Sequence, residues 1–181
     1  CLSEPTVAID PEVRASVLDA AALLEQLGHS VEMAAPGIDY AVLNRVQNTL
    51  IASNMAAWLD SVARGRGREI GLDELEPMTH MIRSEGSRYT GAQVAEALQL
   101  MHQFGFQMGD FFRDFDAILQ PVAATTAPRL AAITYREGDD LQAYTERFKA
   151  VSAFTHLYNM TGQPSMAVPF SMSASGLPIG I

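Results

Sequence analysis

Apolar residues recur at helical spacing within the first thirty positions, and flanking residues mark both ends of this helix. The recurring residues are Val13, Val17, Ala20, Ala21, Leu24 and Leu27. Asp10-Pro11-Glu12 predicts the start, with Asp10 as the N-cap and Pro11 in the first turn, and Gly28 predicts the end. A strand is predicted next, over residues 29–33, with His29 interpreted as a turn residue.

Three further helical patterns follow, over residues 39–63, 75–86 and 90–112, with Thr90 as the N-cap of the third. A basic loop, residues 64–68, is predicted after the first of them, and a fifth helix is predicted to begin near Leu141. The pattern over 39–63 is rich in polar residues (Asn44, Gln47, Asn48, Ser53 and Asn54). Either they form an exposed stripe, or their amides line a cavity; the pattern leaves both interpretations open.

The stretch Asn159–Pro169 joins a helix end to a strand. Gly162 supplies a position for positive φ and Pro164 blocks continuation of the helix. Residues 165–168 are short, mostly apolar and bounded by prolines, which predicts a strand buried on both faces. With a strand at 115–119 and a hairpin in 170–181 that turns at 173–178, the pattern predicts an α/β fold.

Composition and charge exclude several classes of partner. The 181 residues carry a formal net charge of −9, which argues against nucleic-acid and anionic-membrane partners. No apolar run approaches the ~20 residues that span a bilayer. The one cysteine cannot form an internal disulfide, which suits a cytoplasmic location. The start at Cys1 and the strand interrupted at Ile181 lead us to expect part of a longer polypeptide.

The sequence contains no complete catalytic constellation. There is no Gly-x-Ser-x-Gly motif and no Gly-rich phosphate loop. Lys149, the one lysine, is expected in solvent near Glu146 and not as the base for Ser152. His156 is expected to pack or to form a local hydrogen bond. We therefore predict no catalytic residue in this chain.

Metal and cofactor sites are also not predicted. His80 and His102 stand without a second ligand at metal spacing, so we expect no metal and no cofactor. The loop after the strand at 115–119, residues 120–128, is small and rich in hydroxyl groups, and such loops bind ligands in α/β proteins. A proline-stiffened connection explains the same composition equally well.

Three groups of stretches, in this order, resemble the C-terminal half of the amidase signature family. They are Ile9-Asp10-Pro11-Glu12-Val13 with Leu27-Gly28-His29-Ser30-Val31; Phe115-Asp116-Ala117-Ile118-Leu119-Gln120-Pro121 with Ala127-Pro128; and Tyr158-Asn159-Met160-Thr161-Gly162-Gln163-Pro164 with Val168-Pro169 and Gly176-Leu177-Pro178-Ile179-Gly180. Each stretch is moderately specific, and their combined order and spacing extend over nearly the whole chain. Residues 1–181 are thereby identified as the C-terminal portion of a single amidase domain.

The resemblance implies a layered α/β/α fold with a mixed central sheet flanked by helices. It also implies amide hydrolysis by a serine nucleophile, a bridging serine on a cis peptide and a lysine base, all of which the family carries in its N-terminal half. No catalytic residue is transferred to this chain. The positions expected to face the substrate are Ala52 and Asn54 on the polar helix, Thr125 in the loop, and Asn159 at the helix end.

Ser152 stands where the glutamine-using amidotransferase subunits of the family carry an acidic residue. This departure favours an apolar or aryl amide as the small-molecule substrate. The sequence Thr161-Gly162-Gln163-Pro164 resembles that of hydrolases that act on aminohexanoate amides. Two other hypotheses stay open. The chain is an inert fragment that associates with itself, as a homodimer, or with a partner half; or it is a small ligand-binding domain.

Overall fold

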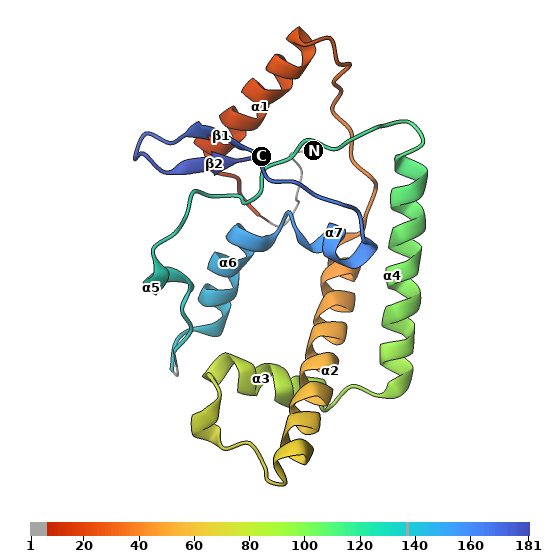
Figure 1. The fold of residues 1–181 in the computed structure, drawn as a ribbon, viewed down its shortest axis with the longest axis vertical. Helices are drawn as coiled ribbons and strands as arrows, with labels where there is room; N and C mark the ends of the chain where they lie inside the picture. The colour runs from red at the N-terminus through yellow and green to blue at the C-terminus, as the bar shows by residue number, and fades with distance from the viewer. Residues whose placement is uncertain (1–6, 137) are drawn as a thin grey trace. The chain divides into compact units, whose positions relative to one another are not determined.

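The computed structural model describes residues 7–136 and 138–181, mostly as helices with one small sheet (Figure 1). The described residues form two compact units. The first contains 7–40, 104–134 and 140–181; the second contains 41–103 and the described part of 135–139. The elements are α1 (Pro11–Gln26), α2 (Tyr40–Arg66), η1 (Leu72–Glu74), α3 (Pro77–Gly86), α4 (Gly91–Phe111), α5 (Leu130–Ile133), α6 (Leu141–Ser152), α7 (His156–Thr161), β1 (Pro169–Met172) and β2 (Pro178–Gly180).

Helix α1 begins and ends where its capping residues predict. The Asp10 carboxylate accepts a hydrogen bond from the Glu12 N–H at 2.8 Å, and Pro11 occupies the first helical position. Gly28, just after the helix, has a φ of 94°. Local capping chemistry therefore determines the bounds of α1.

Strands β1 and β2 form an antiparallel hairpin, as predicted for the end of the chain. Pro169 pairs with Gly180 and Met172 with Pro178. In the turn, Gly176 has a φ of 77°, and the Ser173 hydroxyl accepts a hydrogen bond from the Leu177 N–H at 3.0 Å. The predicted turn residues thus fix the register of the hairpin.

Helix α1 packs against this hairpin within the first unit. The hydroxyl groups of Ser16 and Ser171 lie 2.7 Å apart, and the Glu12 carboxylate accepts from the Ala174 N–H at 2.9 Å. Nearby, the backbone of Ala124 joins two further segments, accepting from the Asp10 N–H at 2.8 Å and donating to the Ala150 carbonyl at 2.7 Å. These bonds enclose a small core of Ala124, Ala153 and Phe154.

Three predicted strands are wrong for this structure. Residues 29–33, 115–119 and 165–167 are extended or irregular but are not part of a sheet, and of the third predicted strand only Val168 is paired, with Ile181 next to the β1–β2 hairpin. The predicted burial of 165–168 is reversed, since all four residues are exposed. A strand requires a hydrogen-bonded neighbour, and among the described residues only β1 and β2 supply one to each other. The predicted layered, mixed sheet is not confirmed.

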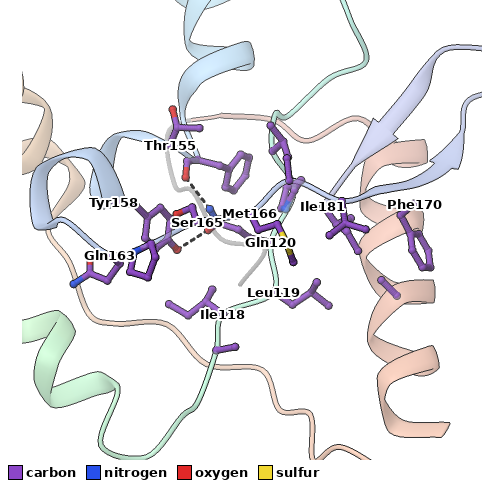
Figure 2. A pocket seen from close by; sticks show the side chains of 18 of the residues that line it. Ile118, Leu119, Gln120, Thr155, Tyr158, Gln163, Ser165, Met166, Phe170 and Ile181 are labelled. Carbon is purple, nitrogen blue, oxygen red and sulfur yellow. Dashed lines mark hydrogen bonds between the residues drawn. The ribbon is translucent and has the colours of Figure 1, made fainter. Parts of the chain in front are cut away.

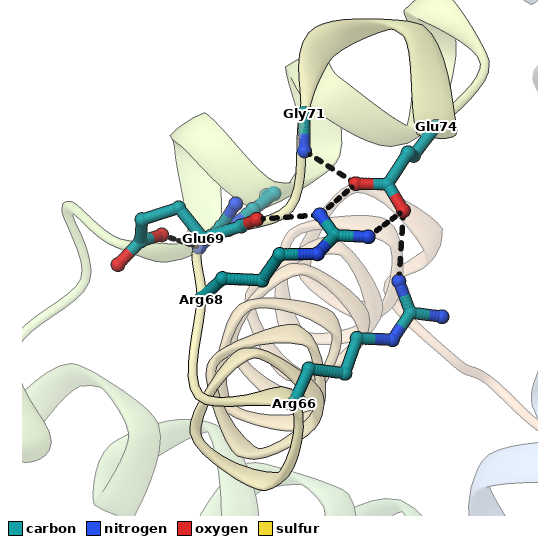
Figure 3. Close-up of polar contacts among 6 residues, drawn as sticks. Arg66, Arg68, Glu69, Gly71 and Glu74 are labelled. Carbon is teal, nitrogen blue, oxygen red and sulfur yellow. Dashed lines mark hydrogen bonds and ion pairs between the residues drawn. The ribbon is translucent and has the colours of Figure 1, made fainter.

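In the second unit, Leu59 and Ala63 of α2 form a small core with Ile70, and Met55, Val62 and Leu75 pack against it. The predicted basic loop is wrong at its start, since residues 64–66 form the last turn of α2. Arg66 and Arg68 both bind the Glu74 carboxylate, at 2.9 and 2.7 Å, and this carboxylate also accepts from the Gly71 N–H (Figure 3). The arginines therefore tie the end of α2 to η1.

Candidate functional site

The first unit contains an open cavity of about 1240 Å³. Its wall is built by the C-terminal half of α1, residues 115–122, α7 and the extended segment 163–168, with Phe170 and Ile181 from the hairpin region. Figure 2 shows these side chains around the hollow. The residues that bracket Gly162, singled out from the sequence, therefore do border a concave site.

The side chain of Gln120 is fixed in this wall by two hydrogen bonds (Figure 2). Its amide N–H donates to the Phe154 carbonyl at 2.7 Å, and its amide oxygen accepts from the Tyr158 hydroxyl at 2.8 Å. A side-chain amide held at both ends has little rotamer freedom left. Gln120 therefore ties the loop before Pro121 to the turn that precedes α7 and to the middle of that helix.

Burial raises the pKa of the Tyr158 phenol to about 12, with a smaller contribution from Tyr40. The phenol thus stays protonated at neutral pH and keeps donating to Gln120. Burial also lowers the pKa of His156, at the start of α7, so this imidazole is uncharged at pH 7.

The cavity wall is mainly apolar. Large apolar side chains come from several segments, among them Phe112, Ile118, Leu119, Met166, Phe170 and Ile181. Among the described residues that line it, Asp116 alone carries a charge, and its side chain is exposed. Such a wall suits an uncharged ligand with a few polar groups to orient it.

The four predicted substrate contacts fall in different places. Asn159, on α7, lines the cavity and is exposed, and its side chain has no hydrogen-bond partner among the described residues. Thr125 is half-buried beside the Ala124 core and is not one of the cavity-lining residues. All four residues remain predictions as substrate contacts.

Ala52 and Asn54 belong to the second unit, on α2. Ala52 is 4% exposed, and Gly86 of α3 lies against its carbonyl group. Asn54 is exposed and donates to the Leu50 carbonyl of its own helix at 2.8 Å. Asn54 also borders a shallow apolar groove with Leu50 and Trp58.

Sequence reasoning missed Gln120 and Tyr158 as site residues. Tyr158 counts as one more apolar position in the helical pattern, and Gln120 as a polar residue before a proline. The two are 38 positions apart, so no local pattern pairs them. The one available signal for a site residue was the position of Gln120, a polar residue directly after the predicted strand at 115–119.

Lys149 and Ser152, the lysine and serine considered from the sequence as a base and its partner, are engaged elsewhere. The Lys149 ammonium lies 3.1 Å from the Glu146 carboxylate, which confirms the predicted surface pair. The Ser152 hydroxyl donates to the Phe148 carbonyl at 3.0 Å. Among the described residues no three His, Cys, Asp or Glu side chains are placed to hold a metal ion, and no helix has both the length and the apolar character to cross a membrane. Cys1 lies outside the described residues.

The profile of the Amidase family matches residues 2–181. This chain belongs to that family. It is 31% identical over 175 residues to the AmiC protein of Mycobacterium leprae (strain TN), covering 94% of this chain and 36% of AmiC. It is 26% identical over 181 residues to the 6-aminohexanoate-cyclic-dimer hydrolase of Paenarthrobacter ureafaciens, covering 96% of this chain and 36% of the hydrolase.

The fold agrees with this assignment. A solved structure of 6-aminohexanoate cyclic dimer hydrolase complexed with substrate matches with a TM-score of 0.82 at 25% identity, over 95% of this chain and 37% of the other. The resemblance to the amidase signature family is thereby confirmed. The chain spans little more than a third of the length of these amidase relatives.

Proposed function

We propose that this chain forms the C-terminal part of an enzyme that hydrolyses the C–N bond of a carboxamide. The observation that carries the proposal is the likeness, at a TM-score of 0.82, to a cyclic-amide hydrolase complexed with its substrate. The family match over residues 2–181 supports the same reaction class.

In this proposal the serine nucleophile, the bridging serine and the lysine base come from outside the present sequence. A serine is a weak nucleophile unless a neighbouring base takes its proton, and the developing oxyanion needs preorganised N–H donors. Lys149 is a poor substitute for the base, because its ammonium pairs with Glu146 on the surface of α6. The layered α/β/α arrangement around a mixed central sheet is part of the same proposal.

We propose an uncharged amide, aliphatic or aryl, as the substrate. The mainly apolar cavity wall supports this choice, and so does the hydroxyl of Ser152 where glutamine-using relatives carry an acid. Asn159, Thr125, Ala52 and Asn54 are the proposed contacts. Of these, Asn159 has the strongest support, because it lines the cavity and its side-chain amide makes no hydrogen bond within the part of the chain that the structure describes.

The experiment compares this chain alone with a chimera that joins it to the N-terminal part of the 6-aminohexanoate-cyclic-dimer hydrolase. Both are assayed on 6-aminohexanoate cyclic dimer and on an aryl anilide. We expect turnover from the chimera and none from the chain alone. Hydrolysis by the chain alone would show that the catalytic residues are misplaced in our proposal. A folded chimera that is inactive on both amides would count against the amidase function.

The other expectations from the sequence stay predictions: no cofactor, no nucleic-acid or membrane partner, a cytoplasmic location and a homodimer. Sedimentation of the purified chain at several concentrations tests the homodimer directly. Activity of the chimera after exhaustive treatment with a chelator tests the absence of a metal.

A further inference from the structure

The side-chain amide of Gln120 has one N–H group that is not used within the cavity wall. A glutamine amide offers two N–H donors and an oxygen that accepts two hydrogen bonds. One N–H donates to the Phe154 carbonyl at 2.7 Å, and the oxygen accepts from the Tyr158 hydroxyl at 2.8 Å (Figure 2). The described residues supply no partner to the second N–H, and Gln120 is half-buried where it lines the cavity. A molecule in the cavity can therefore accept from this N–H without breaking a bond of Gln120 in the wall.

The two partners of Gln120 also determine which end of its amide carries the nitrogen. A backbone carbonyl only accepts hydrogen bonds, so the end of the amide beside Phe154 is the NH2 group. Burial raises the pKa of Tyr158 to about 12, so at neutral pH its hydroxyl keeps the proton that it donates to the amide oxygen. Exchange of the two ends would place the oxygens of Gln120 and Phe154 against each other. The free N–H is therefore held in one orientation.

Gln120 differs from the other polar side chains of the cavity wall because it is fixed at both ends. Among the described lining residues, Asp116, Asn159 and Ser165 are exposed, and Gln163 is held through its oxygen alone, by a hydroxyl at the end of α7. A ligand that covers the fixed N–H without offering an acceptor leaves it desolvated and unpaired, which costs free energy. The wall thus discriminates between ligands by whether they carry an acceptor at this point.

The surroundings of Gln120 favour a neutral carbonyl oxygen as this acceptor. Its neighbours in the wall, Ile118, Leu119 and Pro121, are apolar. No Lys, Arg or His is present among the described lining residues to neutralise a carboxylate, and Asp116 would repel one. A carbonyl group accepts a hydrogen bond from an amide N–H without bringing a charge into the cavity.

We propose that Gln120 is a specificity-determining residue, whose free N–H donates to a second carbonyl group of the substrate that is not hydrolysed. This inference rests on the amidase function proposed above. The carbonyl that is hydrolysed has to lie at the serine nucleophile and its oxyanion donors, which belong outside the present sequence in that proposal. The Gln120 N–H therefore serves a different acceptor. The substrate class is an uncharged amide that carries another carbonyl group on an apolar chain.

The experiment uses the chimera described above and a set of nitroanilides as substrates. One is the nitroanilide of decanoic acid, and the others are nitroanilides of oxodecanoic acids that differ in the position of a single ketone group. The readout is the ratio of kcat/KM for the best ketone substrate to kcat/KM for the decanoic compound. We expect a ratio of about five or more, which falls to about one in Gln120→Met, a variant of similar length without the donor.

Tyr158→Phe is the matched variant, because it removes a bond of the same network and leaves the Gln120 N–H in place. It should lower kcat/KM for all of the nitroanilides by the same factor and so preserve the ratio. A ratio that is unchanged in Gln120→Met would overturn the proposal. A ratio that falls equally in both variants would also overturn it, because Gln120 would then act only through the structure of the wall. A folded chimera that hydrolyses none of the nitroanilides would count against the proposed amidase function instead.

NMR of the chain alone tests the donor independently of catalysis. The probe is N,N-dimethylbutanamide, which has a carbonyl acceptor and no donor. We expect it to shift one of the two side-chain N–H signals of Gln120 in a saturable manner. The side-chain signals of Gln99, an exposed glutamine on α4, should not shift. Gln120 signals that move no more than those of Gln99 would overturn the proposal, whether or not the chimera is active.

Discussion

Gly86 lies against the backbone carbonyl of Ala52 so closely that a Cβ atom at position 86 would sit 1.9 Å from that oxygen. The contact joins the end of α3 to the middle of α2 inside the second unit. Because the obstacle is backbone, a rotamer change cannot relieve it. Ala52, predicted from the sequence as a substrate contact, thus has at least a packing role.

We expect Gly86→Ala to lower the free energy of unfolding by about 3 kcal/mol, since one helix must move to admit a methyl group. Urea denaturation measures this change. Gly105→Ala is the matched control, because a Cβ there meets nothing within 4 Å in the middle of α4. It should stabilise the chain by about 0.5–1 kcal/mol through helix propensity. Equal effects of the two substitutions would refute the close contact.

The structure shows which sequence signals are reliable in this chain. Asp10, Gly162 and Gly176 each act through bonds within a few residues, so their predicted helix ends and turn are found. The strands at 115–119 and 165–168 were predicted from composition. Whether a segment becomes a strand depends on a partner far away in the chain, which no local pattern reveals.

The candidate site was predictable only in outline, for the same reason. Asn159 borders the cavity because the helix end at Gly162, a local feature, places it there. The contact between Gln120 and Tyr158 depends on how two distant segments pack. Sequence reasoning named Asn159, which borders the cavity and stays a prediction as a substrate contact, and it missed the pair that fixes the cavity wall.

The Gln120–Tyr158 hydrogen bond should contribute measurably to stability. We expect Tyr158→Phe to cost about 1 kcal/mol, because it leaves the part-buried Gln120 oxygen without its donor. A double-mutant cycle with Gln120→Ala should give a coupling energy of about 1 kcal/mol in urea denaturation. Strictly additive effects would mean that the bond is absent in solution.

Alkaline titration tests the same residue independently. The folded pKa of Tyr158, about 12, lies above the ordinary value of 10, so its contribution to stability is complete below pH 10 and is lost as the pH rises through 12. The ultraviolet absorbance of phenolate should show one tyrosine that ionises near pH 12 in the folded chain. This step should be missing from the Tyr158→Phe variant.

Glu74 should stabilise the second unit in a pH-dependent manner. Its hydrogen bond from Arg68, followed by the one from Gly71, lowers its pKa from 4.5 to about 2. The stabilisation is therefore present above pH 4.5 and is lost as the pH falls through 2. Glu74→Gln should lower Tm at pH 7. At pH 2 the Tm values of the variant and of the native chain should converge. Glu96→Gln, an exposed carboxylate on α4, should leave Tm unchanged at both pH values.

His156 should cause a separate loss of stability in mild acid. Burial holds its folded pKa below 6.5, so the unfolded chain binds a proton first as the pH falls. The stabilisation is complete above pH 6.5 and declines below it. Urea midpoints at pH 5.0 and 7.5 should differ less in His156→Gln than in the native chain. The control is His102→Gln, which replaces an exposed histidine on α4 and should keep the native difference between the two urea midpoints. If His102→Gln reduces this difference as much as His156→Gln does, His156 is not its cause.

Asn159 offers the most direct test of the proposed substrate contact, in the chimera described above. Its amide borders the cavity without a partner among the described residues, so it can bond a substrate carbonyl or N–H without first breaking a bond in the protein. We expect Asn159→Ala to raise KM about fivefold, since one hydrogen bond is worth about 1 kcal/mol. Asn48→Ala, at an exposed position of α2, should leave KM and kcat unchanged. If Asn159→Ala instead lowers the melting temperature and leaves KM as it was, the residue supports α7 and does not contact the substrate.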